Sequence, residues 1–75
     1  MKSHILTILS EALPAVDFES DFLFAELDSL GVTTILMILA NEYKIPLKAS
    51  DATPKNLKSL DAIVAMVETK LAARQ

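Results

Sequence analysis

Apolar residues recur at helical spacing near the start of the chain. Between positions 5 and 13 they include many pairs three or four residues apart, which is typical of a helix with one buried face: Ile5, Leu6, Ile8, Leu9, Ala12 and Leu13. Ser3 is placed to cap the first turn, and Pro14 forbids continuation beyond Leu13. The pattern predicts a first helix that ends at Leu13.

The segment from Ser29 to Tyr43 is strongly apolar. Asp28 precedes it and is a good N-cap, with its carboxylate facing the positive end of the helix dipole, and Pro46 ends the helix. The run from Ile35 to Ala40 is continuously apolar and is therefore wider than a single core-facing stripe. We expect a second helix that is buried on most sides or that presents apolar surface to a partner.

Two further helix starts follow the connector around Pro46. Thr53 as N-cap and Pro54 at the first helical position indicate a short third helix. Ser59 is the expected cap of the last helix, and Asp61 lies in its first turn, where the dipole favours an acidic residue. The apolar positions of this last helix also have helical spacing: Leu60, Ile63, Val64, Val67 and Leu71.

Residues 15–28 separate the first two predicted helices. They mix acids with apolar residues, and no single period accounts for the pattern: Phe18, Phe22, Leu23, Phe24 and Leu27. We expect a long loop that its aromatic residues pin to the core. A loop of this length in a compact domain is unusual enough to indicate function.

The expected architecture is all-α. Three long helices and one short third helix, without a strand pair or an internal repeat, indicate a small helical bundle. A chain of 75 residues buries only about 60% of the surface that its unfolded form exposes. We therefore expect residues 1–75 to form a single domain around one core.

Composition and charge narrow the class of partner. The net charge of −3 argues against nucleic acid and anionic membranes, which call for clustered Lys and Arg. Acids are concentrated between positions 17 and 28, whereas four of the seven basic residues lie between 44 and 58. No apolar segment approaches the roughly 20 residues that span a bilayer, and the start lacks the pattern of a signal peptide. We expect a soluble, cytoplasmic monomer.

Candidate chemistry is sparse. The chain has no cysteine, which excludes a thiol nucleophile and a thiolate metal site. His4 is the only histidine and lies far along the chain from Ser29, so a solvent-facing or capping role is the better interpretation than that of a base. The acids lack the glycine and terminal glutamate of a calcium-binding loop. We expect no catalytic residue and no metal site.

Ser29 can still be a substrate, although an unassisted serine hydroxyl is a weak nucleophile. In the first turn of a helix and beside the Asp28 carboxylate, it is accessible to a second protein that supplies the base and the metal. The positive end of the helix also favours a phosphate ester there. The two residues alone are equally consistent with a plain helix start.

The arrangement around Ser29 resembles the acyl carrier proteins, whose attachment motif, Asp-Ser-Leu or Asp-Ser-Met, stands here as Asp28-Ser29-Leu30. The run DFLFAELDSL is similar to the family's approach to that motif, and ATPKNLKSLDAIVAMVETKL is similar to its third and fourth helices. The resemblance covers nearly the whole chain. It implies the acyl-carrier bundle and a carrier that itself catalyses nothing.

The resemblance also implies a modification. A phosphopantetheinyl transferase, using coenzyme A and Mg²⁺, would attach 4'-phosphopantetheine to Ser29, with Asp28 helping to position the metal and Leu30 completing the motif. The arm would supply the thiol that the chain lacks and would carry an acyl or aminoacyl group as a thioester. Further partners would be an acyl- or aminoacyl-loading ligase and downstream transferases or synthases.

The second predicted helix departs from the family's pattern. Carriers of fatty acid synthesis usually have several acids along this helix, whereas only Glu42 remains here. We expect partner choice by apolar shape, through Met37 and Ile38, with Glu26 and Asp28 as residual steering charges. Core packing of Met37 and Ile38 is an equal alternative.

Gly31, directly after the motif, is similar to the residue found in D-alanyl carriers and some specialised aminoacyl carriers. It should also loosen the first turn by up to about 1 kcal/mol relative to alanine. Together with the missing acids, it favours a dedicated pathway, fatty-acid-like or specialised, over bulk lipid synthesis. The alternatives are an unmodified interaction module with the carrier fold and an unrelated helical adaptor.

Overall fold

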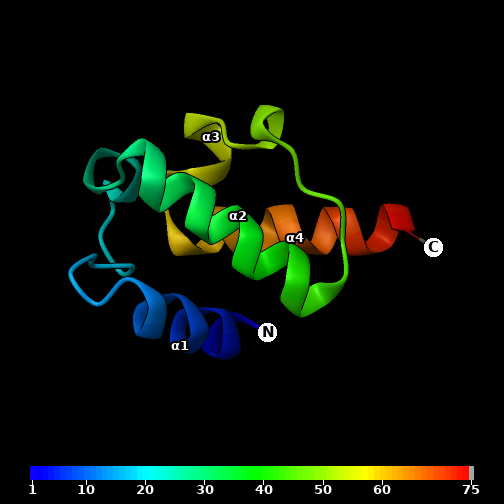
Figure 1. The fold of residues 1–75 in the computed structure, drawn as a ribbon, viewed down its shortest axis with the longest axis horizontal. Coiled ribbons are helices and arrows are strands. Elements are labelled where there is room, and N and C mark those ends of the chain that lie inside the picture. The colour runs from blue at the N-terminus through cyan, green and yellow to red at the C-terminus, as the bar shows by residue number, and fades with distance from the viewer. Residues whose placement is uncertain (75) are drawn as a thin grey trace.

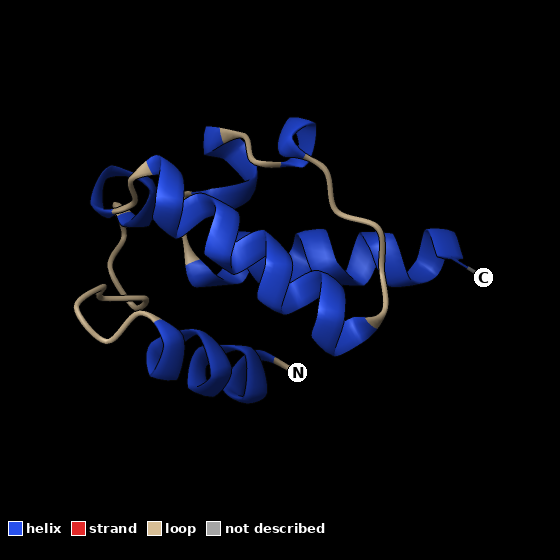
Figure 2. Ribbon diagram, in the orientation of Figure 1, coloured by secondary structure: helices blue, strands red, loops and turns tan. Residues whose placement is uncertain are grey.

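The computed structural model describes residues 1–74, and the side chains of residues 1–73. The α-helices are α1 (Lys2–Ala12), α2 (Ser29–Tyr43), α3 (Pro54–Leu57) and α4 (Leu60–Arg74). Two short 3₁₀ helices lie in the connections, η1 (Leu23–Glu26) and η2 (Ala49–Asp51). The described chain contains no strand (Figure 2), which confirms the all-α bundle of three long helices and one short helix.

The long helices enclose the core. Figure 1 shows α1 along one side of the bundle, α2 crossing α4, and α3 on the side away from α1. Helix α1 packs against both α2 and α4, α2 also packs against α4, and α3 packs against α4 and η1. No helix in the described residues is long and apolar enough to cross a bilayer.

The core takes apolar side chains from every α-helix and from the loops between them. The buried residues are Ile5, Leu9, Phe18, Leu23, Ile35, Leu39, Ile45, Leu57, Leu60, Ile63, Met66 and Val67. Three of the five apolar positions expected on the last helix are fully in the core, while Val64 and Leu71 are partly buried against it. Met66 lies outside the expected stripe because α4 is contacted by three other helices and buries more than one face.

Side-chain caps fix the starts of the later helices. Asp28 Oδ1 accepts a hydrogen bond from Gly31 N at 2.7 Å. Thr53 Oγ1 accepts from Asn56 N at 3.1 Å, and Ser59 Oγ accepts from Ala62 N at 3.2 Å. These contacts confirm the predicted N-caps of α2, α3 and α4, because such caps depend only on residues that are close in sequence.

The predicted cap of the first helix is wrong. Helix α1 already begins at Lys2, and its N-cap residue is Met1, which makes no side-chain cap. Ser3 therefore lies inside the helix, where its carbonyl oxygen accepts a hydrogen bond from Thr7 Oγ1 at 2.9 Å. The helix begins before the first apolar position, Ile5. Its first turn is polar and exposed to solvent, so the apolar pattern does not reveal it.

The end of α2 depends on a left-handed residue and not on proline alone. Lys44 has a φ of 55°, and its backbone N–H donates to the Ala40 carbonyl. Pro46 keeps the preceding Ile45 out of the helical region, so the helix cannot resume after this turn. The predicted end at Tyr43 is confirmed, and the left-handed turn brings Ile45 back into the core.

The connection between α1 and α2 is only partly held by aromatic residues. Phe18 is buried, but Phe22 is 77% exposed and Phe24 is 37% exposed, so the expectation that all the aromatic residues pin this loop is wrong. The 3₁₀ helix η1 places Leu23 in the core instead, and Leu23 N donates to the carbonyl oxygen of Lys58 at 3.2 Å. A 3₁₀ helix has three residues per turn, so neighbouring side chains point in different directions. The rings of Phe22 and Phe24, on either side of Leu23, therefore remain outside the core.

Candidate functional site

Ser29 is the first residue of α2, and its side chain is exposed to solvent. The next residue, Leu30, is also largely exposed, at 73%. Within the described residues, no hydrogen bond engages the Ser29 hydroxyl. The hydroxyl is therefore accessible to solvent at the N-terminal, positive end of the α2 dipole.

Asp28 serves as the N-cap beside this serine. Its Oδ1 accepts the hydrogen bond from Gly31 N, while among the described residues no salt bridge engages either of its oxygens. One oxygen is thus held by the helix, whereas Oδ2 makes no hydrogen bond or salt bridge within the described residues. The backbone at Asp28 is extended, as an N-cap requires.

Gly31 allows this close approach of Asp28. The glycine is buried, and a Cβ built on it would lie 3.1 Å from Asp28 Oδ1 and 3.8 Å from Leu27 Cδ2. A side chain at this position would therefore compete with the carboxylate that caps the helix. The sequence indicates only that Gly31 makes the first turn more flexible. The structure shows that the missing side chain also leaves room for the capping carboxylate of Asp28.

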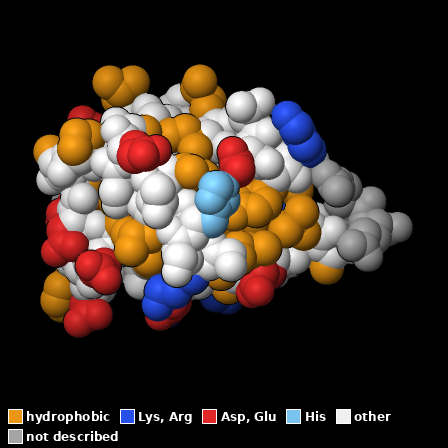
Figure 3. All heavy atoms as spheres, turned by 90° about the horizontal axis from the view of Figure 1, so that it is seen from below, with side chains coloured by type: hydrophobic (Ala, Val, Ile, Leu, Met, Phe, Trp, Pro, Cys, Tyr) orange, Lys and Arg blue, Asp and Glu red, His pale blue; other side chains and the backbone are white. Residues whose placement is uncertain are grey.

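Acidic side chains crowd the same end of the molecule. Seen from below, Asp and Glu gather where the loop between α1 and α2 lies (Figure 3). Glu26 is exposed there, but its Oε1 already accepts a hydrogen bond from Asp17 N at 3.0 Å. Asp17 in turn accepts from Glu19 N at 3.0 Å. Part of this charge therefore shapes the loop, while the carboxylates remain in contact with solvent.

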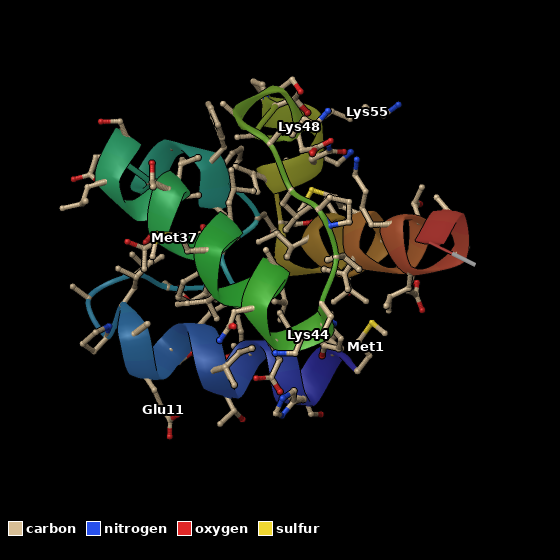
Figure 4. The ribbon with its side chains drawn as sticks, turned by 45° about the vertical axis from the view of Figure 1, so that its right-hand side comes forward. Met1, Glu11, Met37, Lys44, Lys48 and Lys55 are labelled. Atoms are coloured by element: carbon tan, nitrogen blue, oxygen red, sulfur yellow. The ribbon has the colours of Figure 1, made fainter. Side chains whose placement is uncertain are left out.

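The structure separates the two adjacent apolar candidates on α2. Met37 is 66% exposed and projects from the outer face of the helix (Figure 4), while Ile38 is partly buried against the core. A cavity of about 290 Å³ lies beside Met37, between α2 and the following connector, with Leu36 and Leu47 among its lining residues. Only Met37 of the pair offers a broad apolar contact.

His4 lies far from this site and has a structural partner that the sequence does not reveal. Its Nε2 lies 2.7 Å from Glu42 Oε2, and its ring contacts the ring of Tyr43 edge to face, with 6.3 Å between the centroids. Glu42 and Ser29 lie near opposite ends of α2, about 20 Å apart at 1.5 Å per residue. His4 therefore ties α1 to α2 and cannot assist the serine.

The potential metal ligands of the described residues do not cluster. No group of three or more His, Cys, Asp or Glu side chains there could hold a metal ion. The site is a single exposed hydroxyl at the start of a helix, beside a carboxylate and an acidic loop. Such a site offers a hydroxyl for modification but no base within reach to activate it.

A comparison with protein families identifies the class of this protein. The chain matches the family described as "Phosphopantetheine attachment site" over residues 2–67. It belongs to this family of phosphopantetheine-binding carrier domains, whose members carry 4'-phosphopantetheine covalently and are not catalysts. The chain is accordingly a carrier and not an enzyme, which confirms the resemblance to acyl carrier proteins. Searches among curated proteins and among solved structures each gave no match.

The residues at the start of α2 fit a phosphopantetheine ester. The phosphate of the ester would lie at the helix N-terminus, where the first backbone N–H groups have no partner inside the helix. The exposed Ser29 side chain leaves room for the arm to extend into solvent. Asp28 places a negative charge beside the phosphate, which a divalent cation would compensate during attachment.

Proposed function

We propose that this chain is an acyl carrier protein that holds an acyl or aminoacyl intermediate on 4'-phosphopantetheine attached to Ser29. It works as a cytoplasmic monomer in a dedicated pathway, fatty-acid-like or specialised, and residues 1–75 form a single carrier domain. The observation that supports the attachment point is the open Ser29 hydroxyl in the first turn of α2, directly after the capping Asp28.

The arm supplies the thiol that forms a thioester with the cargo. The chain itself has no cysteine, so no side-chain thiol competes for an activated acyl group. The role of Ser29 is to anchor the arm, and the role of the bundle is to hold Ser29 at an exposed end. Tethering raises the effective concentration of the cargo at an enzyme that docks on the carrier.

Asp28 has two roles in this proposal. Through Oδ1 it caps α2 and so fixes the backbone on which Ser29 lies. Through Oδ2 it helps to bind the Mg²⁺ that the phosphopantetheinyl transferase brings with coenzyme A. The exposed Leu30 side chain, on the outer surface next to Ser29, is a contact for the same transferase.

The enzymes that load and use the cargo dock on the outer face of α2 by apolar contact. Met37 is the centre of this surface because it is exposed and borders the cavity beside α2. Ile38 supports it from the core side, and Glu26 with Asp28 supplies the remaining negative charge near Ser29. A loading ligase and the downstream transferases or synthases of one pathway would share this surface.

The scarcity of acids along α2 supports a dedicated pathway. Exposed charges mainly set the encounter rate and the choice among partners. A carrier whose α2 offers the single acid Glu42, whose carboxylate also lies 2.7 Å from His4 Nε2, presents few acids to a basic docking surface. Selection by apolar shape suits a small set of cognate enzymes better than the many enzymes of bulk lipid synthesis.

Intact-mass measurement tests the proposal. The protein is incubated with coenzyme A, Mg²⁺ and a broad-specificity phosphopantetheinyl transferase, beside a Ser29→Ala variant. We expect one added phosphopantetheine on the parent protein and none on the variant. If several transferases fail to modify a folded parent protein, the carrier proposal is wrong and an unmodified interaction module is the better account.

A further inference from the structure

A cavity of about 550 Å³ lies between α3 and α4. It is lined by three lysines and a single aspartate, together with uncharged side chains. None of its lining residues belongs to α2 or to the loop that precedes Ser29. The cavity is therefore a surface feature distinct from the attachment site.

This cavity is open to solvent and is called the α3–α4 groove below. Its one aspartate, Asp51, is already paired with groups of the protein itself. Asp51 Oδ2 accepts a hydrogen bond from Lys48 N at 2.8 Å, and Asp51 Oδ1 lies 3.0 Å from Lys70 Nζ. The Lys48 backbone N–H and then the Lys70 ammonium hold the pKa of Asp51 below its ordinary value. Asp51 is thus ionised and paired at neutral pH.

Lys55 and Lys58 supply the excess positive charge. Both are exposed, and no salt bridge in the described part of the chain involves either of them. Figure 4 shows Lys55 near Lys48 on the α3 side of the molecule, while Lys44 lies at the other end, near Met1. A chain with a net charge of −3 therefore carries a local positive surface.

Three of the α4 residues that line the groove are apolar, beside Thr69 and Lys70. Ala62 and Ala65 line it with small side chains, and Met66, which is largely buried, adds a flexible thioether that can adapt to different shapes. A single carboxylate or phosphate ion would make no apolar contact with these side chains. A volume of about 550 Å³ instead lies in the range of sites that enclose several side chains or a drug-sized ligand.

We propose that the groove between α3 and α4 docks an acidic, partly apolar peptide segment of a partner protein. Carboxylates of the segment pair with Lys55 and Lys58, and an apolar side chain enters against Ala62, Ala65 and Met66. Nucleic acid fits this surface less well because its phosphate backbone would leave the apolar wall of Ala62, Ala65 and Met66 unused. This docking goes beyond the carrier role and does not depend on which residue is modified.

Fluorescence anisotropy with a short, labelled synthetic peptide of glutamate and leucine tests the proposal. We expect saturable binding that weakens as salt screens the charges. Lys55→Glu and Lys58→Glu should each weaken binding by about tenfold or more, because they place like charges opposite each other. Lys44→Glu makes the same change in net charge far from the groove and should leave binding nearly unchanged.

The location of binding is checked separately by amide chemical shifts of the isotope-labelled protein. Shifts confined to α3 and the facing turns of α4, including Ala62 and Ala65, would support the groove. Absence of saturable binding, equal effects of Lys44→Glu and Lys58→Glu, or shifts centred on Met37 would overturn the proposal. A thymidine oligonucleotide that binds the groove as tightly as the peptide would also overturn the assignment to an acidic protein segment.

Discussion

Asp28 Oδ1 lies 2.7 Å from Gly31 N, and a Cβ at Gly31 would come within 3.1 Å of the same oxygen. Gly31 donates the capping hydrogen bond, and a side chain at the same position would obstruct the Asp28 carboxylate that accepts it. Such a Cβ contact is tighter than ordinary van der Waals packing, so either the carboxylate or the first turn of α2 would have to move. Asp28 and Gly31 should therefore be energetically coupled.

A double-mutant cycle measures this coupling. Helix propensity alone predicts that Gly31→Ala stabilises the protein by about 1 kcal/mol. In the parent protein we expect a much smaller gain or a loss, since the new methyl group displaces the Asp28 carboxylate. In an Asp28→Ala background the obstruction is gone, and the gain should approach the full propensity value. Equal effects in the two backgrounds, measured by urea unfolding, would contradict the steric account.

The two proposed roles of Asp28 can be separated by substitution. Asparagine is about as good an N-cap as aspartate, so Asp28→Asn should leave the unfolding free energy nearly unchanged, whereas Asp28→Ala should lower it by about 1 kcal/mol. Both variants should slow phosphopantetheine transfer, by about tenfold or more, because both lack the carboxylate that helps to bind Mg²⁺. Transfer rates follow from the mass gain over time. If phosphopantetheine is transferred to the Asp28→Asn variant at the parental rate, the proposed role of Asp28 in Mg²⁺ binding is wrong and only its capping role remains.

The starts of α2, α3 and α4 could be predicted because each depends on residues three positions apart. Asp28, Thr53 and Ser59 all cap the helices that the sequence indicates. Ser3 has the same chemistry but does not cap, because α1 begins earlier in a polar turn that carries no apolar signal. A local rule thus identifies a cap only where the apolar pattern also locates the helix start.

Features that join distant segments could not be predicted in this way. His4 and Glu42 are 38 positions apart, and only the packing of α1 on α2 brings them together. The exposure of Phe22 depends on η1, a 3₁₀ turn with no clear signature in a short mixed segment. Met37 and Ile38 are adjacent apolar residues that the pattern cannot distinguish, yet the bundle places only Met37 outside.

Met37 provides a direct test of apolar docking. Because its side chain is 66% exposed, Met37→Glu should change the unfolding free energy by no more than about 0.5 kcal/mol. The same change should weaken binding to the cognate loading enzyme by about tenfold, the effect expected for a residue at the centre of an interface. Ala72→Glu adds the same charge at an exposed position of α4 and serves as the matched control. Calorimetric affinities that fall equally for both variants would point to charge and not to the Met37 contact.

The pairing of Asp51 predicts a stability that depends on pH. Its folded-state pKa is lowered, chiefly by the Lys48 N–H and then by Lys70, so the unfolded state binds the proton more readily. The stabilisation is complete above the ordinary aspartate pKa of about 3.9 and is lost as the pH falls toward the lower folded value. Asp51→Asn should therefore cost about 1 kcal/mol at pH 7 and less at about pH 3. A difference that does not shrink in acid urea titrations would contradict this pairing.

The central claim is that Ser29 anchors the arm. After enzymatic loading, fragmentation of the intact protein by mass spectrometry locates the added phosphopantetheine among the serines of the chain. The account predicts that the whole added mass maps to Ser29, and that Ser20→Ala, which removes a serine of the preceding loop, loads fully. Added mass on any other residue, or retention of loading in Ser29→Ala, would contradict the account.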